Sequence, residues 1–450
     1  MRNLVGWALV AVWLVGVPGL VRAQEQPVQP VQPVLRLSLA DARARALETS
    51  HRLAEARARE AATLAGVDAR VAADRPLVSA NAGYTRTNHV AEFAVPAAGA
   101  GGLTRILYPD VPDNYRTRLD VQWPIYTGGR TDALVRAARA EADAAVAETA
   151  VTRADLRLEV SRAFWAVVTG RAAVTVLEQA LVRAEANVAD ARARLNAGLV
   201  PPNEVATAEA RAARQRMLLV EARNLRDVSA ADLARLVGAA PGQEVEPRAV
   251  LEDAATAPAA RDVLAVEARQ QRAERTVLGL RVDLASANRA AAEATRRPQL
   301  AVTGGVDYAR PNPRIFPRAD RWDDSWDAGV SVNWSLWDGG RAAADAAQAT
   351  FQGEAARQRL LEFDSGLSVE VTQRSLEIAS GQAAVAAADE GVRAATEARR
   401  VVGERFSAGV IAQSEVLDAD LDLLQAQLDR TRALANLRLA EARLDRAIGR

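Results

Sequence analysis

The sequence contains no cysteine and only two histidines, His51 and His89. Disulfides, thiolate metal sites, thiol chemistry and lipid attachment through an N-terminal cysteine are therefore excluded, and a histidine metal site would need both histidines. His51 is expected on a helix and His89 in a loop, and both are interpreted as ordinary solvated side chains. We expect no metal and no cofactor. The sequence shows no nucleophile, base and acid arrangement of the kind that enzymes use, so we do not expect an enzyme.

Net charge is also lacking. The 57 basic residues, all of them arginine, balance 57 acidic residues. A chain without a net electric field has no general attraction for nucleic acid or for an anionic membrane surface. Nucleic-acid binding is therefore disfavoured.

The N-terminus has the features of an export signal. Arg2 supplies the positive charge, an apolar stretch follows from Leu4 to Leu20, and small or modest residues precede a cut after Ala23. Glycine and proline interrupt the apolar stretch, which argues against a stable spanning helix, although an uncleaved anchor is the alternative. Residues 1–23 are thus a predicted signal peptide, and the Pro- and Gln-rich residues 24–36 are predicted to form an extended tether.

The rest of the chain is an internal repeat. The segment Trp123–Arg130 (WPIYTGGR) returns as Trp334–Arg341 (WSLWDGGR), a shift of 334 − 123 = 211 positions, which also carries Gly238 onto Gly449. Upstream the shift is 222, because the first copy has 222 − 211 = 11 extra residues, and only a surface loop tolerates such an insertion. We therefore expect a first repeat over 37–238, a linker over 239–262 and a second repeat over 263–450.

Each repeat contains two segments in which apolar and polar residues alternate, as in two-faced strands. They are expected near residues 77–87, 115–126, 299–309 and 325–337. Each has about ten residues, the length that a tilted strand needs to cross a bilayer. The indole rings of Trp123, Trp326 and Trp334 suit the lipid–water interfaces, since Trp326 and Trp334 share a face near opposite ends of one strand. An antiparallel sheet on a soluble core is the alternative.

Four strands cannot close into a barrel, because the curvature of a barrel requires about eight. Open edges in lipid would leave unpaired backbone groups, each costing several kcal/mol. The chain must therefore contribute its strands to an oligomer, and a trimer would provide 3 × 4 = 12 strands.

Two segments without proline, 130–196 and 341–407, predict helices of unusual length, since 67 residues at 1.5 Å each extend roughly 100 Å. Both are rich in alanine and carry apolar residues every seven positions, which is typical of helices supercoiled against neighbours. Glycine then ends each helix, and an antiparallel partner follows, over 202–237 in the first repeat and 414–448 in the second.

With these features the chain resembles the TolC type of outer-membrane efflux protein, from LSLADARARALETSHRL at residues 37–53, through the turns RLNAGL and RFSAGV, to the final RAIG. The resemblance implies a mainly α fold with a small β part. It also implies a homotrimer with a 12-stranded barrel in outer-membrane lipid and a helical tunnel in the periplasm. Such a protein is a passive export duct in a tripartite efflux pump or a type I secretion system, working with a periplasmic adaptor and an inner-membrane transporter.

The resemblance also implies site residues. Acidic residues just after the second periplasmic turn ring the tunnel entrance in the family, and they match Glu415 and Asp418. The first repeat keeps Glu204 but has Thr207 opposite Asp418, and the basic latch residue expected near Ile411 is absent. Acids that favour the N-terminal turn of a helix are the simpler alternative.

The helical turns match the hairpin tips to which the adaptor docks in the family. The matching residues are Arg194, Gly198, Arg405 and Gly409. As an alternative, the glycines only end helices and the arginines are only solvated. A different class of function, a periplasmic coiled-coil adaptor or scaffold without a pore, also stays open, and the exported substrate cannot be derived from the sequence.

Overall fold

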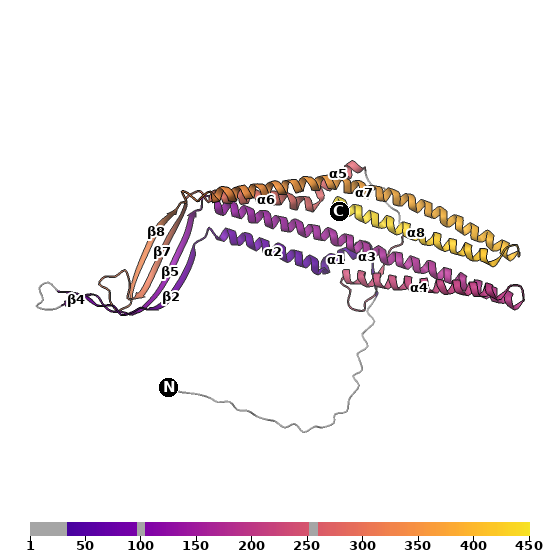
Figure 1. Cartoon of the computed structure of the whole chain (residues 1–450), viewed down its shortest axis with the longest axis horizontal. Coiled ribbons are helices and arrows are strands. Elements are labelled where there is room, and N and C mark those ends of the chain that lie inside the picture. The colour runs from indigo at the N-terminus through magenta and orange to yellow at the C-terminus, as the bar shows by residue number, and fades with distance from the viewer. Residues whose placement is uncertain (1–33, 97–103, 252–259) are drawn as a thin grey trace, which may run out of the picture.

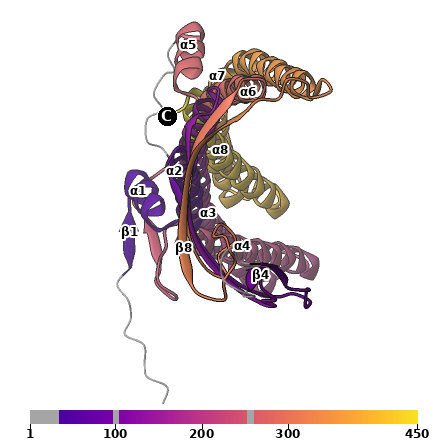
Figure 2. The same cartoon turned by 90° about the vertical axis from the view of Figure 1, so that its left-hand side faces the viewer.

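The computed structural model describes residues 34–96, 104–251 and 260–450. The predicted signal peptide and nearly all of the predicted tether lie outside this part of the chain. Long helices run side by side to one end of the molecule, and a small sheet occupies the other end (Figure 1). Seen end-on, the sheet and the helices follow one arc, as a piece of a curved wall would (Figure 2).

The two repeats contribute four helices each, α1 (Leu39–Thr49), α2 (His51–Ala72), α3 (Arg130–Asn196), α4 (Pro202–Leu236), α5 (Arg261–Gln271), α6 (Ala273–Ala294), α7 (Arg341–Ser407) and α8 (Gln413–Ile448). The long helices α3 and α7 have the bounds expected from the sequence. The single helix expected at the start of each repeat is instead two helices. The breaks fall at Ser50 and Arg272, which are equivalent positions of the two repeats because 272 − 50 = 222. The Ser50 hydroxyl caps α2 by accepting a hydrogen bond from the Leu53 amide.

The helices pack side by side in a layer that is four helices wide. Near the sheet the order across the layer is α2, α3, α6 and α7, and toward the far end it is α4, α3, α8 and α7. Among the described residues α3 alone is long and apolar enough to cross a membrane, but half of its most apolar window is buried within the protein. Alanine allows its neighbours to approach closely, so we assign α3 to the core of the helical layer.

The main core lies halfway along the layer of helices, which forms the shaft of the molecule. Phe164, Val160 and Leu233 are fully buried there, and the short strands β1 (Leu35–Leu37) and β6 (Val245–Pro247) cover this cluster. β1 and β6 pair in parallel, with Leu35 opposite Val245. β1 begins in the predicted extended tether (24–36), and β6 lies in the predicted linker (239–262). The two strands form because apolar residues in both segments can be buried together on the helices.

The main sheet has the order β2 (Leu77–Arg86), β5 (Asp113–Tyr126), β7 (Gln299–Arg310) and β8 (Asp323–Asn333), and all neighbours are antiparallel. The two repeats therefore join through β5 and β7, and no described residue pairs with the outer edge of β2 or of β8. The surface loop expected in the first repeat contains a hairpin of β3 (Phe93–Pro96) and β4 (Thr104–Tyr108).

The last strand is shorter than the expected 325–337, because it ends at Asn333. Its partner β7 begins opposite, at Gln299, directly after Pro298, which has no amide hydrogen to donate to the ladder. Trp334 therefore lies just outside the sheet, where its indole nitrogen donates to the Arg296 carbonyl at 3.0 Å.

Candidate functional site

The main sheet has two chemically different faces. On β5 the residues Tyr115, Leu119 and Trp123 alternate with Arg116 and Arg118. The apolar face continues on β8, where exposed fractions reach 73% for Trp326, 67% for Val330 and 64% for Val332. A continuous apolar face of this kind indicates contact with lipid or with another chain.

Aromatic side chains gather at the end of the sheet far from the helices. The ring of Tyr115 lies 5.0 Å from that of Tyr84 and 5.9 Å from that of Trp322, which stacks on Tyr308 at 4.9 Å. The sequence analysis missed this cluster, because its three tyrosines stand in three different strands and Trp322 stands in none. Only the register of the sheet brings them together.

At the end of the sheet next to the helices lie two of the three tryptophans proposed for the lipid interface. The indole nitrogen of Trp123 donates to the Asp74 carbonyl at 3.1 Å, and that of Trp334 donates to Arg296. These two bonds are related by the repeat. Trp326, the third, lies three residues inside the opposite end of β8. Aromatic residues thus stand near both ends of the apolar face, as in the girdles of membrane barrels.

The opposite face of the sheet carries a network of charges. The Asp307 side chain is only 2% exposed and accepts from Nε of Arg116 at 2.6 Å and from Arg118. Arg118 also binds Asp120, at 2.6 Å, and Asp327, at 3.0 Å. Gly305 leaves room for this guanidinium, since a Cβ there would lie 2.7 Å from its Cζ. Such a face suits water and ions rather than lipid.

The predicted gate residues lie at the starts of α8 and α4. Asp418 accepts from Arg211 of α4 at 2.8 Å, and its side chain is 65% exposed. Glu415 is exposed, Glu204 at the start of α4 is half-buried, and the described residues offer no hydrogen bond or ion pair to either carboxylate. The structure therefore does not join these three acids within one chain.

A polar cluster that the sequence analysis missed ties α8 to its neighbours beside the predicted gate. Asp420, 13% exposed, accepts from Asn187 of α3 at 2.7 Å and from Arg399 of α7 at 3.1 Å, and it lies 3.7 Å from Arg183. Gln413 donates to the Asn187 carbonyl at 3.0 Å. Arg183 and Asn187 are four residues apart on one helix face, the one signal that the sequence offers.

The hairpin tips differ although the sequence repeats. Gly198 (φ 69°) and Gly409 (φ 74°) end their helices in the left-handed conformation, as expected. The guanidinium of Arg194, however, lies 3.9 Å above the Phe406 ring and binds Asp190 at 3.1 Å. Arg405 is exposed, and the described residues provide its side chain with no partner.

The family profile of outer membrane efflux proteins matches residues 42–239 and 262–450, which is most of the chain. No curated protein sequence matches the chain. Three similar solved structures are channels. The outer membrane protein VceC of Vibrio cholerae is 21% identical, with a TM-score of 0.74, over 91% of this chain and 96% of that one. The CmeC outer membrane channel of Campylobacter jejuni is 14% identical, with a TM-score of 0.76, over 91% and 85%. The MtrE channel of Neisseria gonorrhoeae, in its open state, is 19% identical, with a TM-score of 0.74, over 91% and 88%.

Fold and sheet chemistry thus define a membrane channel protein built from two repeats. The chain belongs to the outer membrane efflux protein family. It is an outer-membrane channel that extends into the periplasm and serves export, and the family is one of channel proteins. The resemblance stated from the sequence is confirmed. Nothing supports the alternative of an adaptor or scaffold without a pore.

Proposed function

We propose that three copies of this chain form one passive export duct, served by a periplasmic adaptor and an inner-membrane transporter. The main support for this proposal is the main sheet, which has an apolar face, a charged face and two open edges. Three such sheets, joined β2 to β8, give 12 strands with no free edge. The charged face then lines the water-filled interior, and residues 1–23 direct the export of the chain.

The helical layer supports the same assembly, because both of its edges expose apolar residues. On α7 the exposed fractions are 73% for Phe351 and 66% for Val369. On α4, at the other edge, they are 65% for Leu225 and 62% for Val220. Packing α7 of one copy against α2 and α4 of the next removes both surfaces from water.

Native mass spectrometry of the detergent-purified protein tests the assembly, and planar-bilayer recording tests the duct. We expect a mass of three chains and stable ion conductance. A monomer that stays soluble without detergent and conducts no ions would refute both parts of the proposal.

The adaptor is proposed to dock at the hairpin tips. Exposed apolar residues follow the tip glycines, with exposed fractions of 73% for Leu199 and 66% for Val410, and Arg405 lies beside them with a free guanidinium. Arg194 is engaged within the chain and is better placed to hold the two tips together. Arg405→Glu should therefore reduce dye efflux in cells more than Arg393→Glu, an exposed change on the same helix. Equal effects, at equal amounts of folded trimer, would contradict docking at Arg405.

The gate is proposed to lie at the first turns of α8, where three copies of Glu415 face a common axis. In the conformation described here Asp418 is held by Arg211, so the two acids of each chain are not equally free. We propose that the contacts of Asp418 and Asp420 hold α8 against α3, α4 and α7, and that these contacts break when the hairpins untwist to open the duct. Glu204 is proposed to add a second, outer set of carboxylates.

A further inference from the structure

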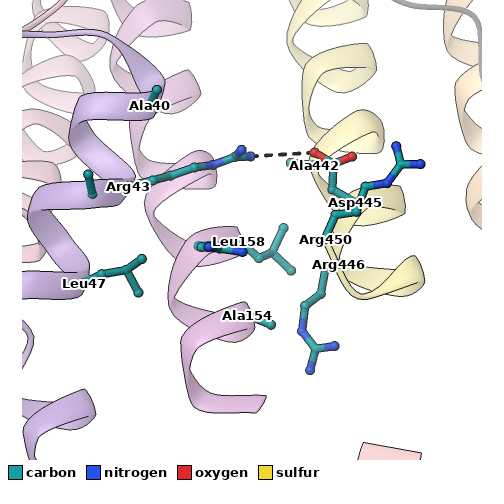
Figure 3. A pocket seen from close by; sticks show the side chains of 11 residues that line it. Ala40, Arg43, Leu47, Ala154, Leu158, Ala442, Asp445, Arg446 and Arg450 are labelled. Carbon is teal, nitrogen blue, oxygen red and sulfur yellow. Dashed lines mark ion pairs between the residues drawn. The ribbon is translucent and has the colours of Figure 1, made fainter. Parts of the chain in front are cut away.

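A cavity of about 360 Å³ lies halfway along the shaft, between α1, α3 and the end of α8. Four arginines line it: Arg43 from α1, Arg157 from α3, and Arg446 and Arg450 from the end of the chain. Figure 3 shows Arg43 reaching across from α1 toward Asp445, the one acidic residue in the lining. Within the lining, four guanidinium groups therefore stand against one carboxylate.

Two of these arginines are already paired outside the cavity. Arg450 binds Glu267 through two hydrogen bonds of 2.9 Å. Arg446 binds Asp155 at 2.7 Å and also binds Glu274, but its Nη1 is buried and has no partner.

The other two lack a close acidic partner. The nearest carboxylate to Arg43, that of Asp445, is 3.9 Å away, although Nε of Arg43 donates to Ser161 at 2.9 Å. The guanidinium of Arg157 has no hydrogen bond or ion pair to any described residue. Burial lowers the pKa of Arg43, and the charge of Arg157 lowers it further, against the opposite effect of Asp445. Arg43 and Arg157 are thus the two arginines of the cavity that no carboxylate binds closely.

The repeat shows that packing does not require these charges. The position equivalent to Arg43, at 43 + 222, is Ala265 in the second repeat, and the one equivalent to Arg157, at 157 + 211, is Ser368. Ala239, directly after the first repeat, corresponds to Arg450, and only Arg446 has an arginine, Arg235, as its counterpart. The packing of α5 on α7, which corresponds to that of α1 on α3, is therefore built with alanine and serine at these two positions.

We propose that this cavity binds an oxyanion, a carboxylate or phosphate group, through Arg43, Arg157 and the free Nη1 of Arg446. Guanidinium groups offer paired N–H donors that match the oxygens of such groups. The ligand would bridge α1 and α3 of the first repeat with α8 of the second, and would stabilise the joint between them. The cavity is larger than one phosphate, so it also accepts the anionic group of a larger molecule.

Isothermal titration calorimetry on the full chain in detergent, at constant ionic strength with chloride as the background anion, tests this site. The probes are inorganic phosphate, acetate and glycerol 3-phosphate, which separate a free ion from an ester and a phosphate from a carboxylate. We expect saturable binding of at least one probe, and a loss of roughly tenfold or more in affinity for Arg157→Ser, since a charge-assisted contact is removed.

Arg157→Ser introduces the residue of the equivalent position on α7, and the side chain of Arg157 is exposed, so the variant should fold. Arg139→Ser, an exposed change on the same helix outside the cavity, is the matched control and should bind like the unaltered protein. Arg43→Ala provides a second loss of binding from another helix. Absence of saturable binding by the unaltered protein, or equal affinities for the Arg157 and Arg139 variants, would overturn the proposal.

Discussion

The ion pair between Arg211 and Asp418 provides the sharpest test of the proposed gate. It joins α4 to α8, so the two hairpins of one chain cannot separate at this level without breaking it. Replacing Asp418 by Asn removes the charge and keeps the size of the side chain. We expect the duct to open more often, because the closed arrangement loses a contact that the open one does not have.

The size of the effect follows from the exposure of the pair. The side chains are 35% and 65% exposed, which places the pair among surface ion pairs worth about 0.2–1 kcal/mol. If three hairpins open together, the change sums to about 0.6–3 kcal/mol, which shifts the open population by a factor of about 3 to 160. Asp420 and its partners remain in place, so the duct should not stay permanently open.

Single-channel recording in planar bilayers measures this population directly as open probability. Glu209→Gln is the matched control, because Glu209 pairs with Arg192 within the α3–α4 hairpin and does not reach α8. Arg211→Gln should reproduce the effect of Asp418→Asn, and the double variant should add little to either. An open probability for Asp418→Asn equal to that of the control would refute the idea that this pair holds the gate.

Three further expectations concern single positions. Glu415→Gln should lower cation selectivity, measured as the reversal potential in a salt gradient, because it removes the unpaired carboxylate at the proposed entrance; unchanged selectivity would place the ring elsewhere. Gly409→Ala should cost about 1–2 kcal/mol in local stability, seen as faster hydrogen exchange at the tip, since its φ is 74° although no atom lies within 4 Å of the new Cβ. Burial raises the pKa of Glu274, but the hydrogen bonds from Arg446 and from its own backbone amide, with the charges of Arg446 and Arg272, together outweigh this and lower the net pKa. The pair therefore stabilises the fold above the ordinary glutamate pKa and is lost as pH falls through the lower folded value, so acid should lower the melting temperature less in Glu274→Gln.

The long elements could be predicted because their signals are repeated many times. No proline interrupts α3 or α7 over 67 residues, and a glycine follows each, so even the bounds are readable. The short pair β1 and β6 could not be predicted, because three residues carry no periodicity and their partners are 210 positions apart. The break at Ser50 was hidden for another reason. A serine within a helical pattern becomes a cap only when the packing around it turns the chain.

The proposed gate and the hairpin tips show a second limit of prediction from sequence, because equivalent residues of the two repeats make different contacts in the folded chain. Sequence alone treats Arg194 and Arg405 as equivalents, yet only Arg194 stacks on Phe406. Likewise Glu415 and Asp418 came from the family pattern, while Arg211, which binds Asp418, and Asn187, which binds Asp420, are 207 and 233 positions away in the chain. Such distant pairs leave no mark in a local pattern.

The same difference between the repeats supports the proposed ring of three chains. α3 and α7 have equal length and related sequences, but within one chain α3 buries 21 residues and α7 buries six. α3 lies inside the helical layer and α7 at its edge. The side chain equivalent to the buried Ala140 of α3 is Phe351 of α7, which is 73% exposed. A large apolar side chain at a position that is buried in the other repeat indicates that another surface covers it in the assembled protein. Because the opposite edge of the same layer is apolar as well, identical copies can supply that surface in turn around a closed ring.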